Sequence, residues 1–97
     1  MIYVITTQNG WKAAMDKGYH ETESLATEGF IHASKEGQVK GVLERHFRNQ
    51  NDLVLLHIDE QLLKAELKYE LAPSVNELFP HIFGRLNIDA VVKTTLL

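Results

Sequence analysis

The sequence contains no cysteine, and only two of its 97 residues are proline. Without thiols the chain has no disulfide framework, no cysteine nucleophile and no zinc site built on sulfur. The absence is compatible with a reducing compartment. Because two independent cores would each be too small to be stable at this length, we expect one domain over residues 1–97.

Long apolar runs and an excess of basic residues are also missing. The densest apolar segments, residues 53–56 and 90–92, are far shorter than the roughly 18 to 20 residues of a membrane helix. Residues 1–6 lack the basic and long apolar regions of a signal peptide. The formal charge of −3 provides no basic face for nucleic acid. We therefore expect a cytoplasmic protein that binds neither membranes nor nucleic acid.

The composition is that of a folded protein, with 44% hydrophobic and 24% charged residues. β-branched or alternating runs predict strands, and amphipathic spacing predicts two main helices. The expected strands cover residues 2–6, 29–33, 53–58, 65–70, 82–83 and 90–95; the expected helices cover 11–17 and about 35–48; residues 71–79 are expected to form a loop. Because the later strands lack helical crossovers, the predicted fold class is α+β, with mixed or antiparallel sheets.

Local chemistry marks the ends of the predicted helices. Either Thr7 or Asn9 is suited to cap the first helix, and Gly18 takes the position after its last turn. Ser34 is the expected N-cap of the second helix. The free N–H groups of a helix start at Ser34 would attract an anion.

Most titratable groups have an ordinary structural interpretation. His46 and His57 continue apolar patterns and are expected to pack, whereas His20 lies in a polar segment and is expected to be solvated. Glu66 and Glu70 share one strand face and are expected to be solvated as well. No histidines have the i, i+4 spacing of a helical zinc site, so we expect no metal.

Two other histidines lie in more informative surroundings. His32 ends a predicted strand just before Ser34, where its imidazole could donate to a ligand or titrate near neutral pH. His81 follows Pro80, which is expected to hold it in a rigid surface loop near Arg85. The structural alternatives are that His32 bonds a nearby carbonyl and that the loop at His81 closes over the core.

Several segments recur together in a known family. They are IYVITT at residues 2–7, SLATEGFIHAS at 24–34, DLVLL at 52–56 and FPHIFGRLN at 79–87. In this order they resemble the bacterial family called domain of unknown function 952, over nearly the whole chain. The resemblance implies a fold similar to ADP-ribosyltransferase-like domains. Enzymes of that fold hold NAD in a cleft with the help of a histidine on the first strand.

The resemblance also implies which residues form the site. His32, Ser34 and His81 match places in the family pattern, and the expected cleft adds Tyr3, Thr6 and Arg85. The first-strand histidine place is occupied by valine (residue 4), which neither donates nor accepts a hydrogen bond. We therefore expect no resident cofactor, although NAD is the one that the fold resemblance implies.

Two hypotheses of function follow from these observations. The first is a cleft that binds a small molecule or nucleotide, with His32 and His81 as candidate catalytic groups and ADP-ribosyl-type chemistry as the implied reaction. The alternative is a non-catalytic accessory or interaction domain in which the histidines are structural. The ligand-binding hypothesis rests on analogy at the level of the fold, so the geometry of the site is needed to choose between the two hypotheses.

Overall fold

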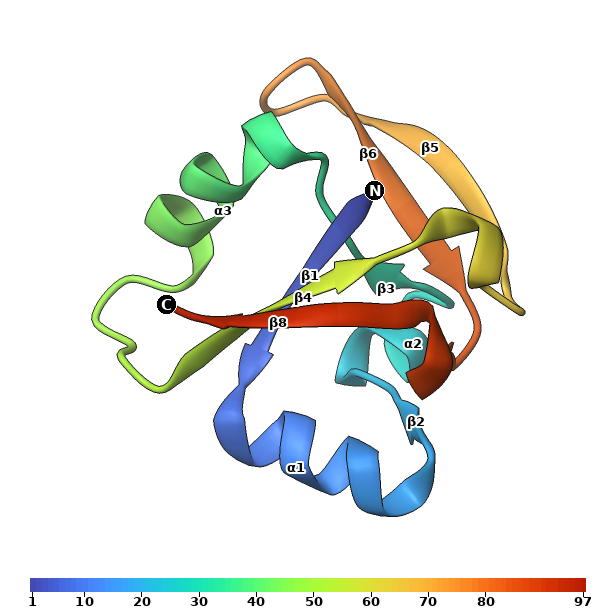
Figure 1. Ribbon diagram of the computed structural model, residues 1–97. Helices are drawn as coiled ribbons and strands as arrows, with labels where there is room; N and C mark the ends of the chain where they lie inside the picture. Colours follow the sequence, from blue (N-terminus) through green and yellow to red (C-terminus); the bar gives the residue numbers. More distant parts are fainter.

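The computed structural model describes all 97 residues, and its strands form three antiparallel sheets (Figure 1). The bounds of the strands are β1 Ile2–Thr7, β2 Tyr19–His20, β3 Ile31–His32, β4 Leu53–Ile58, β5 Glu66–Ala72, β6 Glu77–Phe83, β7 Leu86–Asn87 and β8 Val91–Leu96. The sheets have the orders β1-β4-β8, β2-β7 and β3-β6-β5. Since every strand pair is antiparallel and the helices lie outside the sheets, the predicted α+β class is confirmed.

Three α-helices and three short 3-10 turns connect the strands. They are α1 Gln8–Lys17, α2 Glu23–Thr27, α3 Val39–His46, η1 Glu36–Gln38, η2 Glu60–Leu62 and η3 Ile88–Ala90. The Thr7 hydroxyl accepts a hydrogen bond from the N–H of Gly10 at 2.9 Å, so Thr7 rather than Asn9 caps α1. Gly18 ends α1 in the left-handed region at φ 92°, as predicted. No helix combines the length and the apolar character that crossing a membrane requires.

The second predicted helix starts one residue later than expected. Ser34 and Tyr3 exchange two backbone hydrogen bonds of 2.8 Å, which hold Ser34 in an extended bridge to β1. Lys35 instead takes the N-cap position of η1, and its N–H donates to Gln38 Oε1 at 3.0 Å. The prediction that Ser34 caps this helix is therefore wrong, because its backbone is committed to β1. An anion site built on a Ser34 cap has no basis.

Residues 71–79 form a hairpin rather than the expected loop. β5 continues to Ala72, and β6 begins at Glu77 and runs through Pro80. The Pro80 carbonyl accepts a hydrogen bond from the N–H of Ala33 at 3.1 Å, so this edge of Pro80 faces β3. The Pro80 nitrogen, which has no hydrogen to donate, faces β3 as well, and β3 is only two residues long. A proline is tolerated there because little pairing is lost. His81 consequently lies on the central strand of its sheet, and not in a surface loop.

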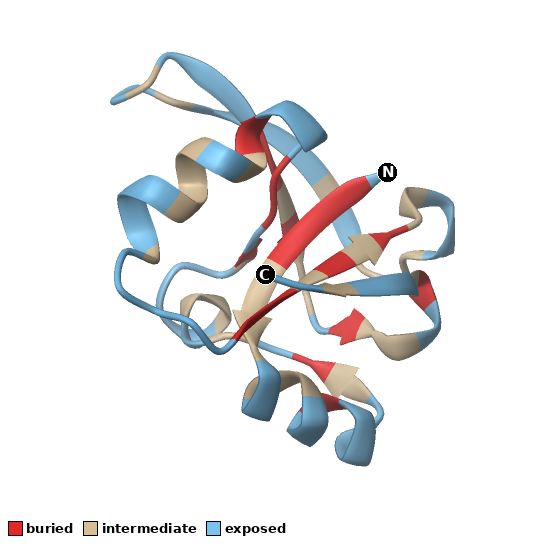
Figure 2. Cartoon of the chain, turned by 60° about the vertical axis from the view of Figure 1, so that its left-hand side comes forward, coloured by how far each residue is buried: buried red, intermediate tan, exposed pale blue.

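The sheets share one hydrophobic core, whose buried residues are drawn red in Figure 2. Its ten members are Ile2, Val4, Ile31, Ala33, Val54, Leu56, Ile58, Ile82, Leu86 and Ala90. They come from all three sheets, and Trp11 of α1 packs against them. The Tyr3–Ser34 bridge joins the two larger sheets at their edges. This junction places the segment around β3 beside β1, where the candidate site lies.

Candidate functional site

A cleft of about 790 Å³ lies where β1, α2, β3, α3 and the β5–β6 hairpin meet. Its volume falls in the range of small-molecule sites. His32, His81, Ser34 and Tyr3 all line it, so the structure brings together four of the six site residues expected from the sequence.

An aromatic cluster of Phe30, His32 and His81, here called the histidine cluster, forms one wall of this cleft. His32 and His81 are directly opposite each other in the β3–β6 register, which places both imidazoles on the same face of the sheet. Their ring centroids are 5.4 Å apart. Phe30 stacks on His81 with centroids 3.9 Å apart and an interplanar angle of 15°. The two histidine motifs of the sequence therefore converge on one place.

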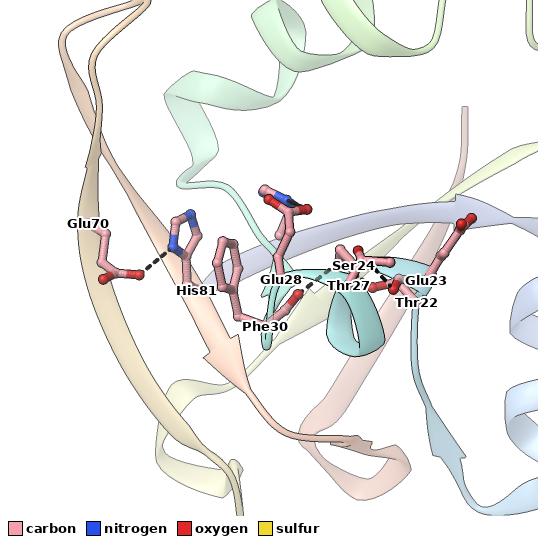
Figure 3. A network of polar contacts seen from close by, with 9 residues as sticks. Thr22, Glu23, Ser24, Thr27, Glu28, Phe30, Glu70 and His81 are labelled. Carbon is pink, nitrogen blue, oxygen red and sulfur yellow. Dashed lines mark hydrogen bonds and ion pairs between the residues drawn. The ribbon is translucent and has the colours of Figure 1, made fainter.

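Each histidine of the cluster is paired with its own carboxylate. Glu28 Oε2 lies 3.0 Å from His32 Nε2, and Glu70 Oε1 lies 2.7 Å from His81 Nδ1 (the latter pair in Figure 3). The His81 side chain is only 13% exposed, whereas that of His32 is 57% exposed. Glu70 was expected to be merely solvated; it is half-exposed, but one oxygen is committed to His81. Glu66 has no such role and pairs with a neighbouring lysine.

Two basic residues at the end of α3, Arg45 and His46, also line the cleft. Arg45 is exposed and takes part in none of the ion pairs of the chain. His46 was expected to pack, but it is exposed. α3 ends at His46, and the half-buried Phe47 that follows also lines the cleft. The cleft thus contains a guanidinium that forms no ion pair within the chain.

Ser34 and Tyr3 contribute differently to the cleft wall. Ser34 is 5% exposed and lines the cleft, and its hydroxyl takes part in none of the side-chain hydrogen bonds of the chain. The Tyr3 ring packs edge-on against His57 with centroids 5.0 Å apart. His57 Nε2 lies 2.8 Å from the Thr95 hydroxyl, in keeping with the packed role expected for His57. Ser34 therefore offers a free hydroxyl, while Tyr3 mainly supports the wall.

The remaining two expected site residues lie outside the cleft. Arg85 Nε donates to Glu21 Oε2 at 3.3 Å, and its guanidinium lies 4.1 Å from the centroid of the Tyr19 ring. It borders a separate, shallower depression beside α2. Thr6 lies near Gly10 at the start of α1 and does not line the cleft. The turn at Gly84 carries Arg85 away from the face that holds His81.

His20 is the histidine that departs most from expectation. It was expected to be solvated, but its side chain is 4% exposed, and Nε2 is buried without a hydrogen-bond partner. Burial lowers the pKa of His20 below its ordinary value, and the charge of Lys17 lowers it further. His20 is therefore favoured as the neutral imidazole in the folded protein.

Glu28, Phe30 and Arg45 were not predicted as site residues from the sequence, and neither was the pairing of Glu70 with His81. Glu28 follows the last residue of α2 and His32 lies in β3, so their separation of four residues is not the i, i+4 spacing of a helix and did not indicate the pair. Phe30 shares the strand face of His32 by simple alternation. Arg45 lines the cleft through the packing of α3, and Glu70 reaches His81 through the β5–β6 register, so no local pattern indicates either side chain.

The fold and the site define a small α+β protein with a cleft walled by two carboxylate-paired histidines. Within that class, the family described as Protein of unknown function (DUF952) matches residues 5–94, and the chain belongs to this family. The motifs EGFIH and FPHIFG, which carried the resemblance, lie on the cleft wall or lead into it.

Solved structures of a bacterial protein have the same fold. The crystal structure of protein CC0527 from Caulobacter crescentus is 32% identical, with a TM-score of 0.88 over 97% of this chain and 82% of that chain. The solution NMR structure of CC0527 gives 32% identity and a TM-score of 0.84, covering 99% of this chain and 83% of that one. No curated protein matches this chain in sequence.

Proposed function

We propose that the cleft binds a small anionic ligand that carries an aromatic ring, with nucleotides as the leading class. The observation that carries the proposal is the combination of Arg45, which has no ion-pair partner, with the histidine cluster in one cleft of about 790 Å³. A guanidinium presents a planar fork of donors that suits phosphate or carboxylate oxygens.

The distribution of charge and apolar surface indicates how such a ligand would lie. Eleven of the 21 lining residues are hydrophobic, which suits a ring system, and the basic side chains are concentrated at the end of α3 and on β3 and β6. Glu23 and Glu28 border the cleft at α2 and would repel an anion there. We therefore place the anionic group at Arg45 and the ring against the apolar part of the wall.

ADP-ribosyl-type chemistry is the finer form of this proposal, and it makes NAD and ADP-ribose the first ligands to test. Val4 is 1% exposed and is paired with Leu56 in the β1–β4 ladder. It cannot replace a histidine that holds the nicotinamide amide. ADP-ribose, which lacks the nicotinamide, is therefore expected to bind at least as well as NAD.

Thermal unfolding in the presence of NAD, ADP-ribose, AMP and inorganic phosphate tests the proposal. A ligand present at ten times its dissociation constant stabilises the folded state by about 1.4 kcal/mol, so screening at about 1 mM detects affinities near 0.1 mM. Arg45→Ala should abolish the increase in Tm. Arg48→Ala is the matched control, because Arg48 is exposed beyond the end of α3 and does not line the cleft. The proposal fails if no ligand raises Tm, or if both variants lose the response equally.

The alternative, a non-catalytic domain with structural histidines, is favoured by one observation. Both imidazoles of the histidine cluster already pair with carboxylates of the same chain. That reading predicts that His32→Ala and His81→Ala lower the free energy of unfolding without changing any ligand response. Because the His32 side chain is exposed, the binding proposal predicts that His32→Ala changes the ligand response more than the stability.

A further inference from the structure

Two contacts fix the orientation of the His81 ring, and one of its two ring nitrogens has no hydrogen-bond partner. Nδ1 lies 2.7 Å from Glu70 Oε1, and one ring face stacks on Phe30. Nε2 makes no hydrogen bond within the chain. Figure 3 shows this second ring nitrogen on the side of the ring away from Glu70. His81 also lines the cleft, so a ligand there can reach the open atom.

The pairing with Glu70 determines which nitrogen carries the proton of the neutral ring. An ionised carboxylate only accepts hydrogen bonds, so Nδ1 must be the donor and Nε2 must keep its lone pair. A separation of 2.7 Å is that of a charge-assisted hydrogen bond. The other charged or titratable groups around the ring are His32 on β3 and Lys68, which is opposite His81 on β5. Lys68 is itself paired with Glu66 at 3.6 Å.

We propose that His81 Nε2 is the proton acceptor of the cleft, acting on a hydroxyl group of the bound anionic ligand, and that Glu70 is its positioning residue. The proposal rests on the proposed function for the binding of the anionic group. The ligand class is a phosphorylated or carboxylated compound that also carries a hydroxyl, such as a ribose phosphate. Arg45 would hold the anion while the histidine cluster contacts the hydroxyl.

The proton transfer is balanced within this arrangement. The O–H bond of the ligand breaks, a bond from Nε2 to the proton forms, and the electron pair remains on the ligand oxygen. The imidazolium keeps its Nδ1–H on Glu70, whose negative charge offsets the new positive charge. Glu70 acts only through the ring and does not touch the ligand.

The tautomer of His81 in the ligand-free protein tests the proposal directly. Long-range ¹H–¹⁵N correlation spectra of the full chain should show neutral His81 protonated on Nδ1. Glu70→Gln should shift the tautomer balance of His81 toward protonation on Nε2. Glu66→Gln is the matched control, because Glu66 lies on the same face of β5 but pairs with Lys68 instead. Protonation of wild-type His81 on Nε2, or an equal effect of both variants, overturns the proposal.

A second measurement separates this inference from the proposed function. Titration with AMP should shift the Nε2 resonance of His81, and 2′,3′-dideoxy-AMP should shift it less, because the ribose hydroxyls are absent. Equal shifts with both compounds overturn the role assigned to the hydroxyl. If neither compound shifts any resonance of the cleft, nucleotide binding fails, and the tautomer of the free protein still decides whether His81 is held as a proton acceptor.

Discussion

His20 combines a buried imidazole with a ring nitrogen that lacks a hydrogen bond, and this combination couples the stability of the protein to pH. Burial, followed by the positive charge of Lys17, lowers the pKa of His20 in the folded state. The unfolded chain has the ordinary value of 6.5. Below that pH the unfolded state therefore binds more protons than the folded state, and the free energy of unfolding falls as the pH is lowered.

We expect wild-type protein to lose stability from pH 7.5 to 5.5, with a slope from this group of at most about 1.4 kcal/mol per pH unit. His20→Gln should flatten the dependence in this window, since glutamine does not titrate. Denaturant unfolding at several pH values measures the effect. His46→Gln is the control, because the exposed His46 side chain is not desolvated. An unchanged profile in His20→Gln would contradict the assignment.

Single residues were predictable where their role is local. The capping hydroxyl of Thr7 and the left-handed conformation of Gly18 act on their own helix, and both are visible in the sequence. The burial of His20 was not predictable, because it depends on the pairing of β2 with β7. In that pairing His20 is opposite Leu86, which is 66 positions further along the chain. A polar neighbourhood in the sequence therefore does not show where a side chain lies.

At the level of elements, the start of α1 depends on one hydroxyl. Thr7→Ala removes the acceptor for the N–H of Gly10 and is expected to cost about 1 kcal/mol of stability. Asn9→Ala is the matched control, because Asn9 lies inside α1, where alanine is the better helix former. Denaturant unfolding compares the two variants. If Asn9→Ala lost as much stability as Thr7→Ala, the assignment of the cap to Thr7 would be wrong.

The turn between β6 and β7 depends on the lack of a side chain at Gly84. A Cβ atom there would lie 2.9 Å from the Cβ of Ala65, closer than packed carbon atoms approach. Gly84→Ala is therefore expected to destabilise the protein by about 1 to 3 kcal/mol through overpacking. Gly37→Ala meets no atom within 4 Å and should be neutral or stabilising. Equal Tm values for the two variants would argue against this close approach.

The strands were predicted best where they carry a continuous apolar or alternating pattern, as in β1, β4 and β5. Residues 77–81 of β6 were missed because a proline such as Pro80 usually breaks a strand. It is accommodated because β3 is short on the side that the proline faces. That compensation belongs to the partner strand, so the residues around Pro80 do not reveal it. The same error placed His81 in a loop.

At the level of the whole molecule, one core joins all three sheets, which predicts a single cooperative unfolding transition. Ile82 of β6 is fully buried in this core, and Ile82→Val is expected to cost about 0.5 to 1.5 kcal/mol. Trp11 fluorescence and far-UV circular dichroism should report the same lowered midpoint. Leu78→Val, at an exposed site of the same strand, should have less effect. Different midpoints from the two probes would contradict a shared core.

The cleft itself was predicted only in part. The family resemblance grouped His32, Ser34 and His81, and all three line the cleft. The position of Arg85 beside the His81 motif suggested Arg85 as the cation, whereas the arginine that lines the cleft is Arg45. The difference arises because the packing of α3 over the sheets is a tertiary property that no spacing in the sequence encodes.

A ¹H–¹⁵N NMR titration of the full chain with ADP-ribose tests whether the cleft between the histidine cluster and Arg45 binds an anionic, nucleotide-class ligand. If it does, we expect saturable shifts of amide resonances concentrated at Phe30, His32, Arg45 and His81. An absence of shifts at about 1 mM ligand, or shifts centred on Arg85 and the depression beside α2, would contradict it.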